Sequence, residues 1–135
     1  MNAKYSNNSG YSSHIIFITG GTKSGKSEFA EHLAKDTKNL SYVALSEKNT
    51  DDKEWNEKIN SHRKRRPKDW NLIETTDLLN TLIKEDDPLL IDSIGGFVME
   101  NIDRNNKEWL TKVNSLISLL KKRKSVTFIV GEQVG

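Results

Sequence analysis

The chain contains no cysteine, which excludes disulfide bonds, thiolate catalysis and cysteine metal sites. It also has no uninterrupted apolar run of about 18 residues, so the sequence predicts no membrane span. An excess of one charge is lacking too, because 21 lysine and arginine residues are balanced by 19 acidic residues, leaving a net charge of +2. This balance gives no strong field for nucleic acid or a membrane, and we expect neither as a partner.

The first 13 residues lack the apolar core of a signal peptide and are rich in serine and asparagine. We expect residues 1–13 to form a disordered polar tail and residues 14–135 to form a single domain, since 135 residues suffice for one core but not for two. A cytoplasmic location is the default expectation for such a chain.

Short apolar runs alternate with amphipathic stretches along the sequence. The apolar runs predict strands at residues 14–19, 40–45, 71–74, 88–92 and 125–130. Helical spacing predicts helices after residue 25 and at residues 53–66, 77–84 and 108–124, with a turn at 93–96. This alternation implies an α/β fold with a mostly parallel sheet and helices on both faces.

The segment after the first predicted strand matches the P-loop pattern G-x-x-x-x-G-K-[ST]. In such a loop backbone N–H groups surround phosphates, the lysine contacts the β- and γ-phosphates, and the hydroxyl binds Mg²⁺. The following amphipathic helix adds its positive N-terminal end, so the pattern predicts a nucleoside triphosphate site. The alternative is a glycine-rich turn without a ligand. The predicted nucleotide-binding residues are Gly20, Gly21, Thr22, Lys23, Ser24, Gly25, Lys26 and Ser27.

A P-loop site needs an acidic residue near Mg²⁺, usually at the end of a second buried strand. Asp92 ends the strand predicted at residues 88–92, so we expect Ser27 and Asp92 to bind the metal. The alternative is that Asp92 only caps a helix or turn that begins at Ser93. Glu74 also closes a predicted strand and is either a contact to the ribose or base or a surface acid.

One histidine lies in a run of cations from His62 to Pro67. The simplest interpretation is a solvated basic helix end stopped by proline. A second is a phosphate-handling histidine, because nearby positive charge keeps an imidazole neutral and nucleophilic while arginines hold phosphate oxygens. Such a histidine would attack an α-phosphate and carry the nucleotidyl group. A third is RNA contact by the cluster, with Trp70 stacking on a base.

Together these motifs resemble one family, the bifunctional adenosylcobinamide kinase / adenosylcobinamide-phosphate guanylyltransferases of cobalamin biosynthesis. The P-loop is generic, but a His-x-x-x-Arg-Pro element followed by tryptophan at this distance is specific. The resemblance implies a RecA-like P-loop NTPase fold. The matching segments are the P-loop, Tyr42 to Ala44, Asp51 and Asp52, Ile59 to Pro67, Trp70, Glu74, Leu90 to Ser93, and Glu132 to Gly135, which resembles the family's Glu-x-x-Gly.

The resemblance implies two activities. One phosphorylates the aminopropanol hydroxyl of adenosylcobinamide with a nucleoside triphosphate, GTP or ATP; the other transfers GMP from GTP onto adenosylcobinamide phosphate through a guanylylated histidine. His62 would be that catalytic histidine, and the protein would form homo-oligomers whose subunits share sites. The nucleotide-binding positions that the resemblance adds are Ser46, Glu47, Arg63, Lys64, Arg65, Arg66, Glu74 and Asp92.

The sequence departs from the family pattern in two places. Family members continue for some tens of residues beyond the Glu-x-x-Gly element, and that C-terminal segment is absent from a sequence ending at Gly135. Lys23 stands where an arginine is usual, which changes the geometry of a phosphate contact. Two alternative functions remain: a nucleotide-binding module without turnover, and a small-molecule kinase in which His62 has no role.

Overall fold

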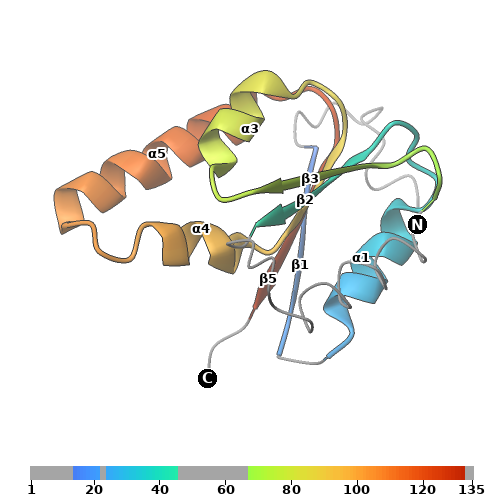
Figure 1. Ribbon diagram of the computed structural model, residues 1–135, viewed down its shortest axis with the longest axis horizontal. Helices are drawn as coiled ribbons and strands as arrows, with labels where there is room; N and C mark the ends of the chain where they lie inside the picture. The colour runs from blue at the N-terminus through green and yellow to red at the C-terminus, as the bar shows by residue number, and fades with distance from the viewer. Residues whose placement is uncertain (1–13, 22–23, 46–66, 133–135) are drawn as a thin grey trace.

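The computed structural model describes residues 14–21, 24–45 and 67–132, which form a single sheet and the helices that cover it (Figure 1). The strands are β1 (Ile15–Gly20), β2 (Ser41–Leu45), β3 (Asn71–Thr75), β4 (Leu89–Asp92) and β5 (Thr127–Glu132). The helices are α1 (Lys26–Ala34), α3 (Leu78–Lys84), α4 (Ile94–Glu100) and α5 (Asn106–Lys122).

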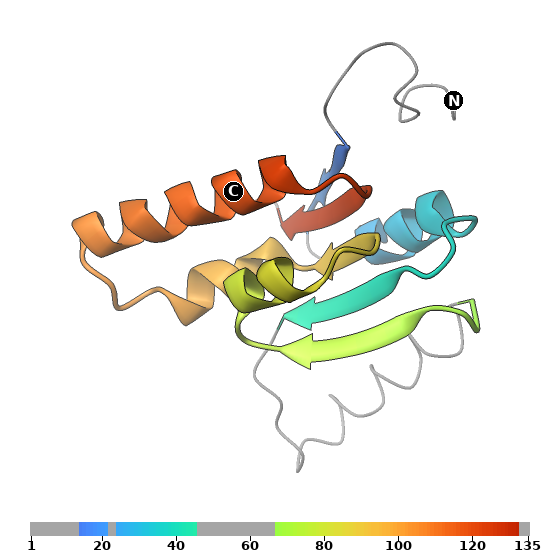
Figure 2. The same ribbon diagram turned by 90° about the horizontal axis from the view of Figure 1, so that it is seen from above.

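The strand order is β1-β5-β4-β2-β3, and every described pair of neighbours is parallel. Figure 2 shows β2 and β3 side by side and pointing the same way. The α/β prediction is therefore confirmed, with a described sheet that is wholly rather than mostly parallel. One strand, β5, separates the strand before the P-loop from the strand that ends at Asp92, as in the predicted RecA-like arrangement.

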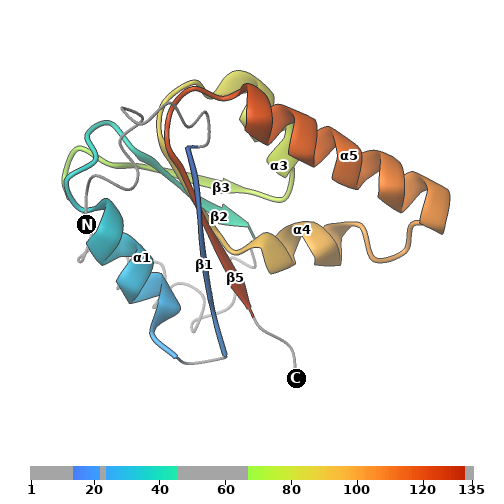
Figure 3. The same ribbon diagram turned by 180° about the vertical axis from the view of Figure 1, so that it is seen from behind.

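Helices cover both faces of the sheet, as predicted. Helix α1 lies on one side, and α3, α4 and α5 lie on the other (Figures 1 and 3). Along β4 the side chains alternate, so Leu90 packs in the core beneath α1 while Leu89 and Ile91 pack beneath the other three helices. Because both faces are buried, the central strands are apolar throughout, which is why they read as continuous apolar runs in the sequence.

The turn predicted at residues 93–96 is wrong, because α4 begins at Ile94 and contains both glycines of that segment. Glycine disfavours helix, but tertiary packing overrides this preference here. A Cβ atom at Gly96 would lie 2.2 Å from the carbonyl oxygen of Leu45, so only glycine lets α4 approach β2 this closely. The helix thereby starts directly beside the carboxyl end of β4.

Helix α5 begins at Asn106, two residues before the predicted start at residue 108. Its start is set by a capping box, in which Asn105 Oδ1 accepts a hydrogen bond from the Glu108 N–H at 2.8 Å and Glu108 Oε1 accepts one from the Asn105 N–H at 3.2 Å. The helix ends at Lys122, where the basic last turn suits the helix dipole.

Arg123, directly after α5, ties that helix to the loop before β4. Its guanidinium donates hydrogen bonds to the carbonyl oxygens of Glu85 and Asp87, and its Nε donates to Thr127 Oγ1 at 3.0 Å. Burial lowers the pKa of Arg123, and the nearby Asp86 charge opposes that shift. Residues 121–124 are all lysine or arginine, and within this run Arg123 has a structural role.

Two predicted segments lie outside the described residues: the polar tail at residues 1–13 and the helix at residues 53–66. In the part of the chain that the structure describes, none of the helices has the length and apolar character needed to span a membrane.

The two glycines of α4 provide a matched test of this packing. Gly96→Ala should lower the free energy of unfolding by about 1–3 kcal/mol, because the new methyl group overlaps the backbone of β2. Gly95→Ala places its Cβ 3.4 Å from Ser93 Oγ, an ordinary contact, so it should be neutral or stabilising. Urea unfolding measures both values, and equal effects would contradict the close approach of α4 to β2.

Candidate functional site

The candidate site lies at the carboxyl ends of β1, β5 and β4. Gly20 at the end of β1 is in register with Glu132 on β5, and Val130, two residues before Glu132, is in register with Asp92 at the end of β4. The P-loop follows β1 and leads into α1 at Lys26. Open α/β sheets bind ligands at this edge, so the strand order itself brings the P-loop and Asp92 to one place.

The P-loop backbone has the features that its glycines allow. Gly25, the N-cap of α1, has φ 82°, a left-handed backbone conformation that residues other than glycine rarely adopt. At Gly20 a Cβ atom would lie 2.5 Å from Ser24 Oγ. The Ser24 N–H donates to the Gly21 carbonyl oxygen at 3.2 Å. Thr22 and Lys23 lie outside the described residues.

Lys26, the P-loop lysine, lies folded back over the loop. Its Nζ donates to the Gly21 carbonyl oxygen at 3.2 Å and lies 3.8 Å from Glu132 Oε1. The Lys26 side chain is 10% exposed and that of Glu132 is 54% exposed. Sequence reasoning noted the motif that begins at Glu132 but missed this contact, which requires knowing that β5 neighbours β1.

Ser27, at the start of α1, contacts Asp92 across the sheet edge. Its Oγ donates a hydrogen bond to Asp92 Oδ2 at 3.0 Å, and the two residues are 65 positions apart in the chain. The alternative capping role for Asp92 does not hold, because the N-cap of α4 is Ser93. A hydroxyl and a carboxylate oxygen are the hard donors that Mg²⁺ prefers, so this pair fits the predicted metal site.

Tyr42 is a further site residue, and sequence reasoning did not assign it there. It lies on β2, is 3% exposed, and its hydroxyl donates a hydrogen bond to Asp92 Oδ2, the same oxygen that Ser27 contacts. The only signal in the sequence was its place in the Tyr42 to Ala44 segment, because nothing local to that strand reveals that β2 pairs with β4.

Glu74 lies near the carboxyl end of β3, on the far side of β2 from Asp92. Both residues are in register with Ala44 on β2, so they face the same side of the sheet. Two strand spacings separate their backbones, roughly 10 Å. Glu74 is half-buried and takes part in an interaction of its own. It therefore borders the site, two strands from Asp92.

The other predicted site residues lie outside the described residues. They are Ser46, Glu47, His62, Arg63, Lys64, Arg65 and Arg66. Within residues 14–21, 24–45 and 67–132 no group of three or more His, Cys, Asp or Glu side chains is arranged to hold a metal ion.

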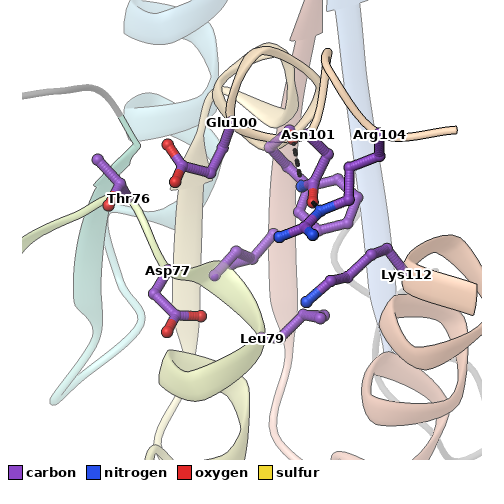
Figure 4. A pocket seen from close by; sticks show the side chains of 9 residues that line it. Thr76, Asp77, Leu79, Glu100, Asn101, Arg104 and Lys112 are labelled. Carbon is purple, nitrogen blue, oxygen red and sulfur yellow. Dashed lines mark hydrogen bonds between the residues drawn. The ribbon is translucent and has the colours of Figure 1, made fainter. Parts of the chain in front are cut away.

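A separate pocket of about 220 Å³ lies among α3, α4 and α5 on the opposite face of the sheet (Figure 4). Arg104 Nε donates to Asn101 Oδ1 at 3.0 Å, which holds the guanidinium at the pocket wall. Acidic and basic side chains balance around the pocket, so its charge selects no single class of ligand. Its lining residues are Thr76, Asp77, Leu78, Leu79, Phe97, Glu100, Asn101, Arg104 and Lys112.

A family model described as cobinamide kinase / cobinamide phosphate guanyltransferase, CobU, matches residues 16–135. The chain belongs to this family. It is 28% identical over 139 residues to the bifunctional adenosylcobalamin biosynthesis protein CobU of Escherichia coli K12, with 90% of this chain and 76% of the relative covered. It is 37% identical over 84 residues to the protein of the same name from Salmonella typhimurium LT2, with 59% of this chain and 45% of the relative covered.

In this CobU-family chain the contact between Lys26 and Glu132 should be weak, because the carboxylate is half-exposed. Glu132→Gln should lower the free energy of unfolding by less than about 1 kcal/mol. The difference should vanish at about 1 M salt, where the Debye length is about 3 Å.

Glu108→Gln is the matched control, since it removes a carboxylate of similar exposure, 52%, that pairs with Arg104 at 3.9 Å, while glutamine preserves the capping box. Urea unfolding at low and high salt measures both variants. A loss at Glu132 that greatly exceeds the control and persists at high salt would show that the lysine is held firmly.

Proposed function

We propose that this chain phosphorylates adenosylcobinamide and transfers GMP from GTP onto the resulting phosphate, as a step of cobalamin biosynthesis. The observation that carries the proposal is the hydrogen bond between Ser27 and Asp92 beneath a P-loop, in a chain whose residues 16–135 match the CobU family. The names of the two bacterial relatives agree with this role.

The triphosphate, GTP or ATP for the kinase reaction, would lie on the P-loop at the start of α1. Backbone N–H groups of the loop and the positive end of α1 would face its phosphates. Lys26 would exchange its contact with Glu132 for the β- and γ-phosphates, a small cost because the Glu132 carboxylate is half-exposed. Ser27 and Asp92 would hold Mg²⁺, which neutralises charge on the phosphate oxygens when bound.

In the kinase reaction the aminopropanol hydroxyl attacks the γ-phosphorus. A new O–P bond forms, the bond from the γ-phosphorus to the bridging oxygen breaks, and a nucleoside diphosphate leaves as the hydroxyl proton is lost. Lys26 stabilises the charge on the transferred group, because its Nζ already lies over the loop that holds the phosphates.

In the guanylyltransferase reaction a nitrogen of His62 attacks the α-phosphorus of GTP and releases pyrophosphate. A phosphate oxygen of adenosylcobinamide phosphate then attacks the same phosphorus, and the bond to His62 breaks. The support for these steps is the cationic run from His62 to Pro67 together with the family match. Arg63 to Arg66 would hold the phosphates in this reaction.

Assembly into a homo-oligomer is part of the proposal. Among the described strands β1 lies at an edge of the sheet, and the Phe17 side chain on it is 55% exposed. An exposed strand edge carrying an aromatic ring favours contact with a second chain.

The proposal is tested with GTP labelled at the α-phosphate. The wild-type chain should retain label in a bond that acid breaks and base does not, as expected for a phosphoramidate, and His62→Ala should retain none. His32→Ala is the matched control, because His32 is an exposed residue on α1 and should leave labelling unchanged. Label that survives in His62→Ala would exclude the histidine mechanism.

The same preparation separates the alternative functions. Transfer of a γ-label to adenosylcobinamide without α-labelling would favour a small-molecule kinase. Saturable nucleotide binding with neither transfer would favour a binding module. RNA binding would show a steep loss of affinity with salt that does not depend on Mg²⁺.

A further inference from the structure

Two hydroxyl groups hold the carboxylate of Asp92. Ser27 Oγ and the Tyr42 hydroxyl both donate to Oδ2, and in the described part of the chain no hydrogen bond reaches the other oxygen, Oδ1. The carboxylate is therefore held along one side and open along the other. A carboxylate has a broad torsional preference about its last bond, so its orientation is set by such contacts.

Tyr42 contacts Asp92 from the neighbouring strand β2. On β2 the residue in register with Asp92 is Ala44, and Tyr42 lies two positions earlier on the same face. Tyr42 belongs to the core cluster beneath α1 and is in register with Leu90 on β4. Phenylalanine would keep the ring in this core but would lack the hydroxyl that Tyr42 donates to Asp92.

We propose that Tyr42 is a positioning residue that turns the open oxygen of Asp92 toward Mg²⁺ bound with the nucleotide, an inference that rests on the proposed nucleotide and metal site. A hydrogen bond to an ionised carboxylate is short and strong, and partners of this kind fix the orientation of metal ligands. Ser27 is itself a predicted ligand of the metal, so Tyr42 supplies a hydrogen bond to Asp92 from a group that does not bind the metal.

A purely structural role for Tyr42 would have different consequences. A buried hydroxyl needs a hydrogen-bond partner, so Asp92 would then serve only to satisfy the phenol. Removing the hydroxyl would change stability and affect nucleotide binding equally with and without Mg²⁺. If Tyr42 instead positions Asp92, removing the hydroxyl should change the Mg²⁺ concentration that nucleotide binding requires and leave binding without Mg²⁺ unchanged.

The test compares wild type with Tyr42→Phe by titrating Mg²⁺ into the protein with GTP and measuring GTP affinity by calorimetry. The Mg²⁺ concentration for half-maximal enhancement should rise by about 10- to 100-fold, as for loss of other partners of metal ligands. GTP affinity in the presence of EDTA should stay unchanged.

Thr81→Val is the matched control, because it removes another buried hydroxyl, one that donates to the Asp77 carbonyl oxygen at 2.9 Å on the opposite face. It should leave the Mg²⁺ requirement unchanged.

A second measurement uses the wild-type chain and does not depend on the variant folding. The sequence has three tyrosines, at positions 5, 11 and 42, so ¹³C labelling of the phenol carbon gives three signals, assigned through Tyr5→Phe and Tyr11→Phe. Adding Mg²⁺ to the GTP complex should shift the Tyr42 signal.

An unshifted Tyr42 signal, an unchanged Mg²⁺ requirement in Tyr42→Phe, or equal losses of affinity with and without Mg²⁺ would each overturn the positioning role. A wild-type chain that binds no GTP would instead overturn the proposed function.

Discussion

The hydrogen bond between Ser27 and Asp92 joins the P-loop side of the candidate site to the end of β4, and it depends on how the strands and α1 are packed. Because β5 lies between β1 and β4, the P-loop and Asp92 do not follow neighbouring strands. Helix α1 therefore spans β5 where it brings the Ser27 hydroxyl to 3.0 Å from the Asp92 carboxylate. The small residues Ala30 and Ala34, both fully buried, let α1 lie close to the sheet. The glycine at position 96 does the same for α4 on the other face.

Asp92 and Lys26 are held in the candidate site by contacts of different strength. Asp92 is held by a buried tyrosine from a central strand, so its carboxylate is positioned before any ligand arrives. Lys26 is held by a half-exposed carboxylate at 3.8 Å, a contact that water and salt weaken. A ligand with several phosphate charges would displace the second contact and leave the first intact. This difference in exposure between Tyr42 and Glu132 is the physical basis for the proposal that Asp92 positions the metal and Lys26 binds phosphate.

Much of this could be predicted from sequence, because the P-loop pattern and the doubly buried strands are local signals. The strand ending at Asp92 and the helix after Gly25 both lie where periodicity predicted them. The contacts of Tyr42 and Glu132 could not be predicted, since they depend on which strands are neighbours, and strand order is set by packing of the whole sheet. The segment at residues 93–96 was misread for a related reason: its glycines signal a turn locally, whereas contact with β2 requires glycine inside a helix. The role of His62 remains a prediction, as that residue lies outside the described part of the chain.

The central claim is that Lys26, Ser27 and Asp92 form one site for a triphosphate and its metal. The most direct test is calorimetric titration of GTP, with and without Mg²⁺, into the wild type, Lys26→Ala and Asp92→Asn, the last of which retains an acceptor for both hydroxyl groups. The account predicts saturable binding that Mg²⁺ strengthens in the wild type, weak binding under both conditions in Lys26→Ala, and binding that Mg²⁺ no longer strengthens in Asp92→Asn. Equal binding by all three proteins, or none by the wild type, would contradict it.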